Sequence, residues 1–470
     1  MQYYLTMRRN CFRMKLQIKE KGEHMKKRWL AGISSAILWG SGQFFFCKQY
    51  LKGLILFFIQ MLVVGIELSS SYIIEYLSGD IGDFSIRLHG GFFARGIWGF
   101  LTLGTEEGGK YGDHSTMLLI TGIITILLCL VLAGIYLFQI RDAYRMGKQI
   151  DETGSCPSSK EYFKELYGKS FVYVILIPIL VFVIFIVVMP IIFAILTAFT
   201  NYNTNHMPPG KLVSWVGLSN FKKLFQIPIW STTFLSVLRW TLIWTVAATF
   251  STYFLGMFQA ILLNSKYTKC KSLFRSIMIL PWAIPQLISL LVFRNFLNGQ
   301  FGPVSKFLVD IGLTDHRIQF LSDPVLAKLT ILAVNLWLGF PMFMIMIQGI
   351  LSNIDRSLYE AAEIDGGGSF AIFRKITMPL VTKATAPLIV MNLAGNFNGF
   401  SLIYFLTNGG PVNTDYQFAG DTDILISWVY KLTLDQKMYD IAAVMNILIF
   451  LLISVVSIWN FRRTQAFREV

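Results

Sequence analysis

The chain has 470 residues, of which 54% are hydrophobic and only 14% are charged, and its formal net charge is +14. A soluble globular protein carries about 25% charged residues, so this composition excludes an ordinary soluble domain and indicates an integral membrane protein. The basic residues flank apolar segments, which favours a role in setting topology over nucleic-acid binding. The five cysteines form no C-x-x-C pair and the five histidines are scattered, so neither a disulfide framework nor a metal site is expected.

The first 46 residues contain a basic segment followed by a short apolar one. Residues 1–28 hold nine basic residues, and no small-residue cleavage site follows the next apolar run, so a cleavable signal is not expected. Residues 29–46 are shorter than a spanning helix and contain Gly40 and Gly42. We interpret them as a re-entrant or interfacial segment. If they crossed the membrane instead, the N-terminus would change sides.

Eight longer apolar segments are each close to the 20 or so residues that a transmembrane helix requires. They predict an all-α polytopic membrane protein with about eight transmembrane helices. The predicted spans cover residues 50–76, 116–140, 171–199, 238–263, 272–293, 326–350, 384–406 and 441–460.

The distribution of lysine and arginine predicts the orientation of these spans. With eight spans and the N-terminus inside, the inner segments hold 26 basic residues and the outer segments hold 11. Inner loops of membrane proteins are enriched in lysine and arginine, so both termini are expected in the cytoplasm. The outer loops are short, so a large extracellular domain is not expected.

A polar, turn-rich stretch at residues 151–160 suggests a boundary between two regions. Residues 1–165 would form an accessory region that comprises the basic segment, the re-entrant segment and two spans. Residues 166–470 would form a domain with the remaining six spans.

The inner loop at residues 353–383 has the pattern of two short helices around a break. Asp355 can cap the first helix, and the glycines that begin at Gly366 can end it, since glycine accepts the left-handed conformation of a helix C-terminus. Ser369 can cap the second helix, and Pro379 is expected to end that helix before the next span. Several apolar residues in this loop predict a surface that binds a partner; they are Tyr359, Ile364, Phe370 and Phe373.

This loop resembles the EAA loop of ABC importer permeases, whose pattern is E-A-A-x3-G-x9-I-x-L-P. Here Glu360-Ala361-Ala362 is followed at the same spacing by Gly366, and later by Ile376 and Pro379; Met378 replaces the leucine. The resemblance implies that the loop, called the coupling loop from here on, docks on a partner ATPase. The residues implied in this contact are Glu360, Ala361, Ala362, Asp365, Gly366, Ile376 and Pro379.

The similarity extends over residues 170–465, which look like the MalF-type permeases of maltose and maltodextrin importers. It is carried by the stretches Leu280–Pro285, Asn335–Pro341, Asn396–Phe400, Leu406–Pro411 and Gly420–Leu425. The resemblance implies the type I ABC importer permease fold in the six C-terminal spans, and location in the cell membrane of a bacterium. The short outer loop at residues 200–237 departs from the enterobacterial relative, which carries a folded domain there.

The family resemblance also implies partners. They are a MalG-like second permease subunit, an ABC ATPase dimer and an extracellular solute-binding protein. The chain contains no G-x-x-x-x-G-K-[ST] sequence, so ATP and Mg²⁺ are expected on the ATPase, with no enzyme activity, cofactor or nucleic-acid binding in this chain.

Asparagines inside the predicted spans suggest a sugar site, because polar residues are costly there and an amide both donates and accepts hydrogen bonds. The alternative is hydrogen bonding between helices. Trp337 and Phe397 are candidates for stacking on a sugar ring. Gly395 and Gly399 stand where the enterobacterial relative has larger residues, so the site should be roomier. By resemblance, the substrate-binding residues are Gln286, Asn335, Leu338, Gly339, Met342, Gly395, Asn396 and Gly399.

These observations favour a permease for an oligosaccharide, most specifically maltose or maltodextrin. One alternative is a permease for another sugar, such as a raffinose-type oligosaccharide or a polyol. A second is a non-transporting membrane scaffold or sensor, against which the complete EAA pattern argues.

Overall fold

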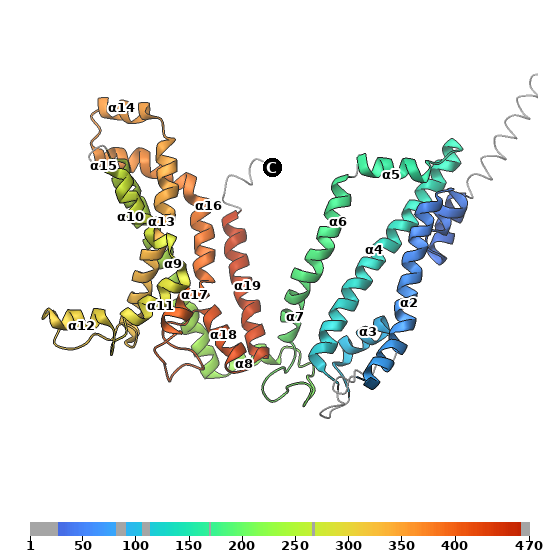
Figure 1. Cartoon of the computed structure of the whole chain (residues 1–470), viewed down its shortest axis with the longest axis horizontal. Helices are drawn as coiled ribbons and strands as arrows, with labels where there is room; N and C mark the ends of the chain where they lie inside the picture. The colour runs from blue at the N-terminus through green and yellow to red at the C-terminus, as the bar shows by residue number, and fades with distance from the viewer. Residues whose placement is uncertain (1–26, 81–90, 106–112, 169–170, 266–267, 462–470) are drawn as a thin grey trace, which may run out of the picture. The chain divides into compact units, whose positions relative to one another are not determined.

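The computed structural model describes residues 27–80, 91–105, 113–168, 171–265 and 268–461, and within these ranges the regular structure is helical (Figure 1). The all-α prediction is therefore confirmed. The contacts divide the chain into two compact units, Met1–Trp215 and Val216–Val470, called here the N-terminal and the C-terminal unit. These units meet at residues 215 and 216, whereas the predicted domains divide at residues 165 and 166; that domain division stays a prediction.

The N-terminal unit is built around one long helix that packs on shorter ones. Glycines allow this close packing: a Cβ on Gly96 would lie 1.9 Å from Oγ1 of Thr125 on the neighbouring helix. Its elements are η1 (Gly42–Phe46), α2 (Tyr50–Asp80), α3 (Phe92–Thr102), α4 (Ser115–Thr153), α5 (Ser159–Gly168), α6 (Phe171–Val183), η3 (Ile184–Val188) and α7 (Met189–Thr197).

Residues 29–46 do not form a continuous spanning helix. Residues 27–37 are helical, a turn follows, and the π-helix η1 brings the chain back toward the start of α2. Gly40 adopts a positive φ of 78° in this turn, a conformation that favours glycine. Buried side chains hold the segment in place: Gln43 donates to the carbonyl oxygen of Gln139 at 2.8 Å and to Asp142 at 3.1 Å. The re-entrant or interfacial interpretation of this broken segment stays a prediction.

The C-terminal unit has α9 and α13 as its central pair (Figure 1). Gly256 lets the two helices approach, because a Cβ there would lie 2.6 Å from the side chain of Phe343. The elements are α8 (Ser219–Gln226), α9 (Pro228–Asn264), α10 (Lys271–Ala283), α11 (Gln286–Phe296), α12 (Pro303–Asp310), α13 (Pro324–Ser352), α14 (Arg356–Ile364), α15 (Ser369–Ile372), η4 (Phe373–Thr377), α16 (Met378–Phe397), α17 (Phe400–Thr407), α18 (Leu425–Leu434) and α19 (Tyr439–Phe461).

Helices occupy all eight predicted spans, and the described residues contain six helices of sufficient length and apolarity to cross a membrane. The predicted span 272–293 is broken: α10 and α11 meet at an angle of 88°. Pro281 lies in the last turn of α10 and Pro285 lies in the break, as the N-cap of α11; proline disrupts a helix by removing a donor and by steric clash. The predicted span 384–406 is interrupted at residues 398 and 399, between α16 and α17.

Candidate functional site

The first helix of the coupling loop begins and ends as predicted. The Asp355 carboxylate accepts a hydrogen bond from the backbone N–H of Ser357 at 3.0 Å, and this bond holds the pKa of Asp355 below its ordinary value. Helix α14 ends at Ile364, and Gly366 follows with a φ of 76°. The backbone N–H of Gly367 then donates to the carbonyl oxygen of Ala362 at 2.9 Å, which satisfies a helix-end carbonyl.

The second helix of the coupling loop differs from the prediction at both ends. Gly368 occupies the N-cap position and Ser369 is the first helical residue, so the predicted serine cap is wrong. Pro379 does not end the helix, because α15 and η4 continue into α16. The wide π-helical turn of η4 comes directly before the proline, and such a turn provides room for a ring that lacks an N–H donor. The coupling loop is therefore continuous with the seventh predicted span.

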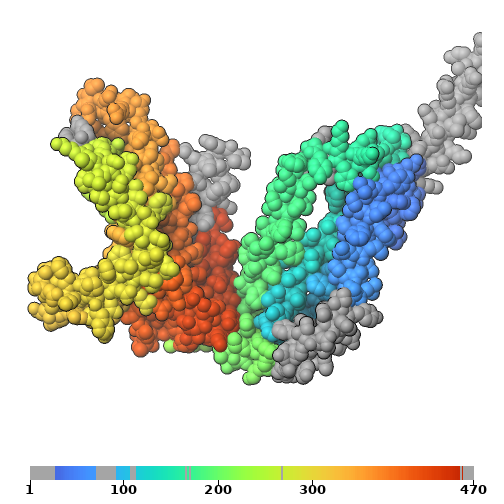
Figure 2. Space-filling model, in the orientation of Figure 1, coloured from blue at the N-terminus to red at the C-terminus, as the bar shows by residue number. Residues whose placement is uncertain are grey.

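A hydrogen bond joins the two halves of the coupling loop. The hydroxyl groups of Tyr359 on α14 and Thr377 in η4 lie 3.2 Å apart. The outer surface of the loop is apolar at Ile364, which is 85% exposed, and at Phe370, which is 73% exposed. In the space-filling view, α14 projects from one end of the C-terminal unit (Figure 2). Exposed apolar side chains on a projecting segment are typical of a surface that binds another protein.

The seven residues implied in coupling share this location, but their exposure differs. Glu360, Ala361 and Gly366 are exposed, whereas Ala362 is half-buried. The other three coupling residues also include both exposed and half-buried side chains. Asp365 and Pro379 are exposed and Ile376 is half-buried. Apart from Ala362, the polar and small residues of the motif are therefore available at the surface.

The C-terminal unit also contains a pocket of about 420 Å³ at the break between α10 and α11. It unites four of the residues predicted to bind substrate, which are Gln286, Asn335, Leu338 and Gly339. The other lining residues come from the broken segment itself and are Pro281, Trp282, Ala283, Ile284 and Pro285. The helix break thus brings an amide of α11 next to an amide of α13.

The two predicted asparagines bind neighbouring residues of α9. Asn335 donates from Nδ2 to the carbonyl oxygen of Ala248 at 3.4 Å. Asn396 donates from Nδ2 to Oγ1 of Thr249 and to Oδ1 of Asn392, both at 2.9 Å. Hydrogen bonding between helices, the alternative use of these residues, is therefore present. Asn335 also faces the pocket, whereas both N–H groups of the Asn396 amide are engaged.

Four predicted substrate residues lie outside the lining of this pocket: Met342, Gly395, Asn396 and Gly399. Gly395 has open space where a Cβ would be, as a roomier site requires. The ring of Phe397 is only 8% exposed, so it offers little surface to a sugar. The ring of Trp337 packs edge-on against Phe293, with 5.1 Å between the ring centroids.

Trp282 is a pocket residue that the sequence reasoning did not single out. Its side chain is 60% exposed and lines the pocket beside Gln286 and Asn335. Aromatic side chains combine a large apolar face with little conformational entropy, and they are common in ligand pockets. The signal in the sequence was an aromatic residue between Pro281 and Pro285, at a point where a helix must break.

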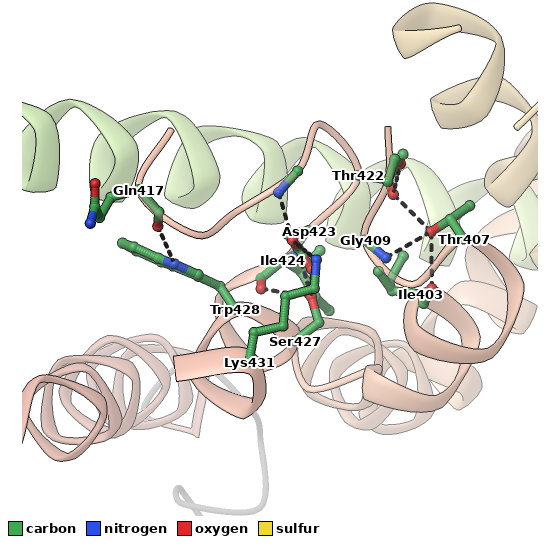
Figure 3. Close-up of polar contacts among 12 residues, drawn as sticks. Ile403, Thr407, Gly409, Gln417, Thr422, Asp423, Ile424, Ser427, Trp428 and Lys431 are labelled. Carbon is green, nitrogen blue, oxygen red and sulfur yellow. Dashed lines mark hydrogen bonds and ion pairs between the residues drawn. The ribbon is translucent and has the colours of Figure 1, made fainter. Parts of the chain in front are cut away.

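A buried polar cluster fixes the loop between α17 and α18 (Figure 3). The fully buried Asp423 carboxylate contacts Nζ of Lys431 at 2.6 Å and accepts hydrogen bonds from the Gly420 N–H and the Ser427 hydroxyl, both at 2.7 Å. Gly409 leaves room for this carboxylate, since a Cβ there would lie 1.9 Å from Oδ1. Burial raises the pKa of Asp423, and Lys431 opposes that effect.

Comparisons with known proteins identify relatives of the chain. The model of the family "Binding-protein-dependent transport system inner membrane component" matches residues 252–464. The chain is 37% identical to the galactooligosaccharides transport system permease protein GanP of Bacillus subtilis, over 95% of this chain and 100% of that protein. It is 36% identical to the maltodextrin transport system permease protein MalC of Streptococcus pneumoniae, over 78% of this chain and 88% of that protein.

A solved structure shares the fold. It is a bacterial ABC transporter involved in the import of the acidic polysaccharide alginate, with 23% sequence identity and a TM-score of 0.53. The similarity covers 65% of this chain and 98% of the matched chain.

Proposed function

Because this chain belongs to the family of binding-protein-dependent transport system inner membrane components, we propose that it is the permease subunit of an ABC importer that carries a neutral oligosaccharide across the membrane. The sugar would pass the pocket at the break between α10 and α11. The coupling loop would receive the movement of a partner ATPase.

The observation that carries this proposal is the pocket shared by Trp282, Gln286 and Asn335. Within the described residues, the Oδ1 atom of Asn335 makes no hydrogen bond and only Nδ2 is engaged, so an acceptor and one N–H remain for a sugar hydroxyl. Gln286 supplies a second amide, and Trp282 supplies an apolar face. These groups suit a neutral sugar, since no charged side chain lines the pocket.

The exposed surface of the coupling loop supports the proposed ATPase contact. We propose that Ile364 and Phe370 are covered by the ATPase, with Glu360 and Gly366 in the same contact. ATP and Mg²⁺ would bind to the ATPase. A MalG-like permease subunit and an extracellular solute-binding protein would complete the importer, and the coupling loop and both termini would face the cytoplasm.

Two substrate classes compete within this proposal. Maltodextrin is favoured by the sequence stretches shared with MalF-type permeases and by the similarity to MalC. A galactooligosaccharide is favoured by the similarity to GanP, which spans the whole of that relative. Both are neutral oligosaccharides and both match the chemistry of the pocket.

The test is sugar uptake by proteoliposomes that contain the full importer, with radiolabelled maltotriose and galactotriose as probes. Asn335→Ala should reduce uptake at least tenfold, and Glu360→Ala combined with Gly366→Leu should abolish it without loss of membrane insertion. Asn205→Ala, at an exposed position of the N-terminal unit, is the matched control and should transport normally. Wild-type uptake of neither sugar would refute the oligosaccharide assignment, and normal uptake by the coupling-loop variant would refute the docking surface.

A further inference from the structure

Three aromatic rings of the C-terminal unit form a cluster that the pocket does not include. Phe400 and Tyr404 on α17 are stacked with 4.9 Å between their centroids. Tyr430 on α18 lies 4.6 Å from Phe400 and 4.8 Å from Tyr404 by the same measure. All three side chains are partly exposed, so their contact with one another leaves aromatic surface open.

The cluster lies on the side of α17 that faces away from the core. Leu402, Ile403 and Leu406 bury the opposite side of this helix among residues of α9, α11 and α13. Helix α17 packs directly against α11 and α13, the two helices that carry the pocket residues Gln286 and Asn335. The aromatic cluster is therefore carried by a neighbour of the pocket wall.

The polar groups of the cluster point to an aqueous path and not to lipid. Tyr404 and Tyr430 each carry a hydroxyl group, and both side chains are partly exposed. Hydroxyl groups that face hydrocarbon lack water as a partner, which is costly. Partly exposed aromatic rings with hydroxyl tips instead suit a ligand with an apolar face and a hydroxylated rim.

The aromatic cluster follows the predicted substrate-binding residues of α16 in the sequence. Phe400 and Tyr404 follow Asn396 by four and eight residues, after the break at residues 398 and 399. Helix α17 lies at the end of the C-terminal unit opposite to α14 (Figure 1). A sugar chain that occupies the pocket would meet the cluster on the side away from the coupling loop.

We propose that Phe400, Tyr404 and Tyr430 form a second carbohydrate subsite, which stacks on a further hexose ring of an oligosaccharide longer than two units. This inference rests on the proposed function. The cluster is positioned by the loop that Asp423 and Lys431 fix, because Tyr430 directly precedes Lys431 on α18. The subsite would add to the binding of long chains and would contribute little to a disaccharide held in the pocket.

The test compares uptake of maltotetraose and maltose, and of galactotetraose and galactobiose, by proteoliposomes that contain the full importer at saturating binding protein. Aromatic contacts contribute about 0.5–1.5 kcal/mol, so Tyr404→Leu should lower the ratio of tetrasaccharide to disaccharide uptake by about 2- to 10-fold. Tyr404→Phe keeps the ring and should retain the ratio. Ser401→Ala, on the same exposed side of α17, is the matched control.

The outcomes distinguish a carbohydrate subsite from a general effect on transport and from a subunit interface. An equal loss for both chain lengths, or an unchanged ratio in both Tyr404→Leu and Phe400→Leu, would overturn the subsite. Loss of the second permease subunit from the purified Tyr404→Leu complex would also overturn it, by assigning the rings to a subunit interface. If Tyr404→Leu does not accumulate in the membrane, Phe400→Leu and the Tyr430→Leu variant decide by the same ratio. Normal wild-type uptake with a failed subsite leaves the proposed function intact, whereas no wild-type uptake refutes both.

Discussion

The ion pair between Asp423 and Lys431 gives a sharp prediction about stability. Asp423→Asn keeps the shape of the side chain but removes its charge, and Lys431 then faces a neutral amide. Removing one partner of a buried pair costs about 3–5 kcal/mol. We expect about 3 kcal/mol, at the lower end, because Lys431 is 15% exposed and its long side chain can turn toward water.

The complementary variant, Lys431→Met, should depend on pH. It leaves the fully buried Asp423 carboxylate without its cation, so the pKa of this carboxyl, already raised by burial, rises further. Since the folded state then binds a proton more tightly than the unfolded state, stability is lost as the pH rises through the folded pKa and is regained as the pH falls. The stability of the Lys431→Met variant relative to the wild type should therefore increase as the pH is lowered from about 8 to about 5.5.

The assay is the thermal midpoint of the purified importer, followed by the fluorescence-detected loss of the monodisperse complex. A destabilisation of about 3 kcal/mol corresponds to a fall of roughly 6–12 °C for a unit of this size. Asp415→Asn, an exposed carboxylate of the same loop, should leave the midpoint unchanged. The double variant Asp423→Asn with Lys431→Met should be more stable than either single variant. A double variant that loses the sum of the two single effects would refute the claim that the groups stabilise one another.

Three further substitutions test other contacts by the same thermal midpoint. Gly409→Ala should lower it by at least as much as Asp423→Asn, since the new Cβ would meet the Asp423 carboxylate and the φ of 70° disfavours alanine; an unchanged midpoint would show that the loop adapts freely. Tyr253→Phe removes a hydroxyl that lies 3.0 Å from Oγ1 of Thr385 and should cost about 1 kcal/mol, an expectation that a gain in stability would contradict. Gln43→Ala breaks the buried network of the N-terminal unit and should cost about 2–4 kcal/mol, so a loss below 1 °C would argue against that network.

The coupling loop was the part of the molecule most open to prediction, because its signals are local. An aspartate cap and a glycine with positive φ act within one turn of the helix end, and Asp355 and Gly366 do so here. The error at Pro379 has a different origin. Whether a proline ends a helix depends on the turn before it, and a π-helical turn is not visible in the hydrophobic pattern.

Contacts between distant parts of the chain could not be predicted in the same way. The hydrophobic pattern marked residues 272–293 as one span, whereas the prolines at 281 and 285 divide it and create the pocket. The Asp423 cluster depends on how the loop closes back on Gly409 and Gly420. The sequence stretches around these residues indicated a family, but their role as a buried support for the loop required the structure.

Helix α9 connects the coupling loop with the proposed sugar path. Its residues Ala248 and Thr249 bind Asn335 on α13 and Asn396 on α16, while Tyr253, one turn further on, binds Thr385 on α16. Helix α13 leads into the coupling loop and α16 continues out of it. A displacement of the coupling loop must therefore move α13 and α16 together with α9, or break these hydrogen bonds. Asn335 also lines the pocket, so such a movement would change the proposed sugar site.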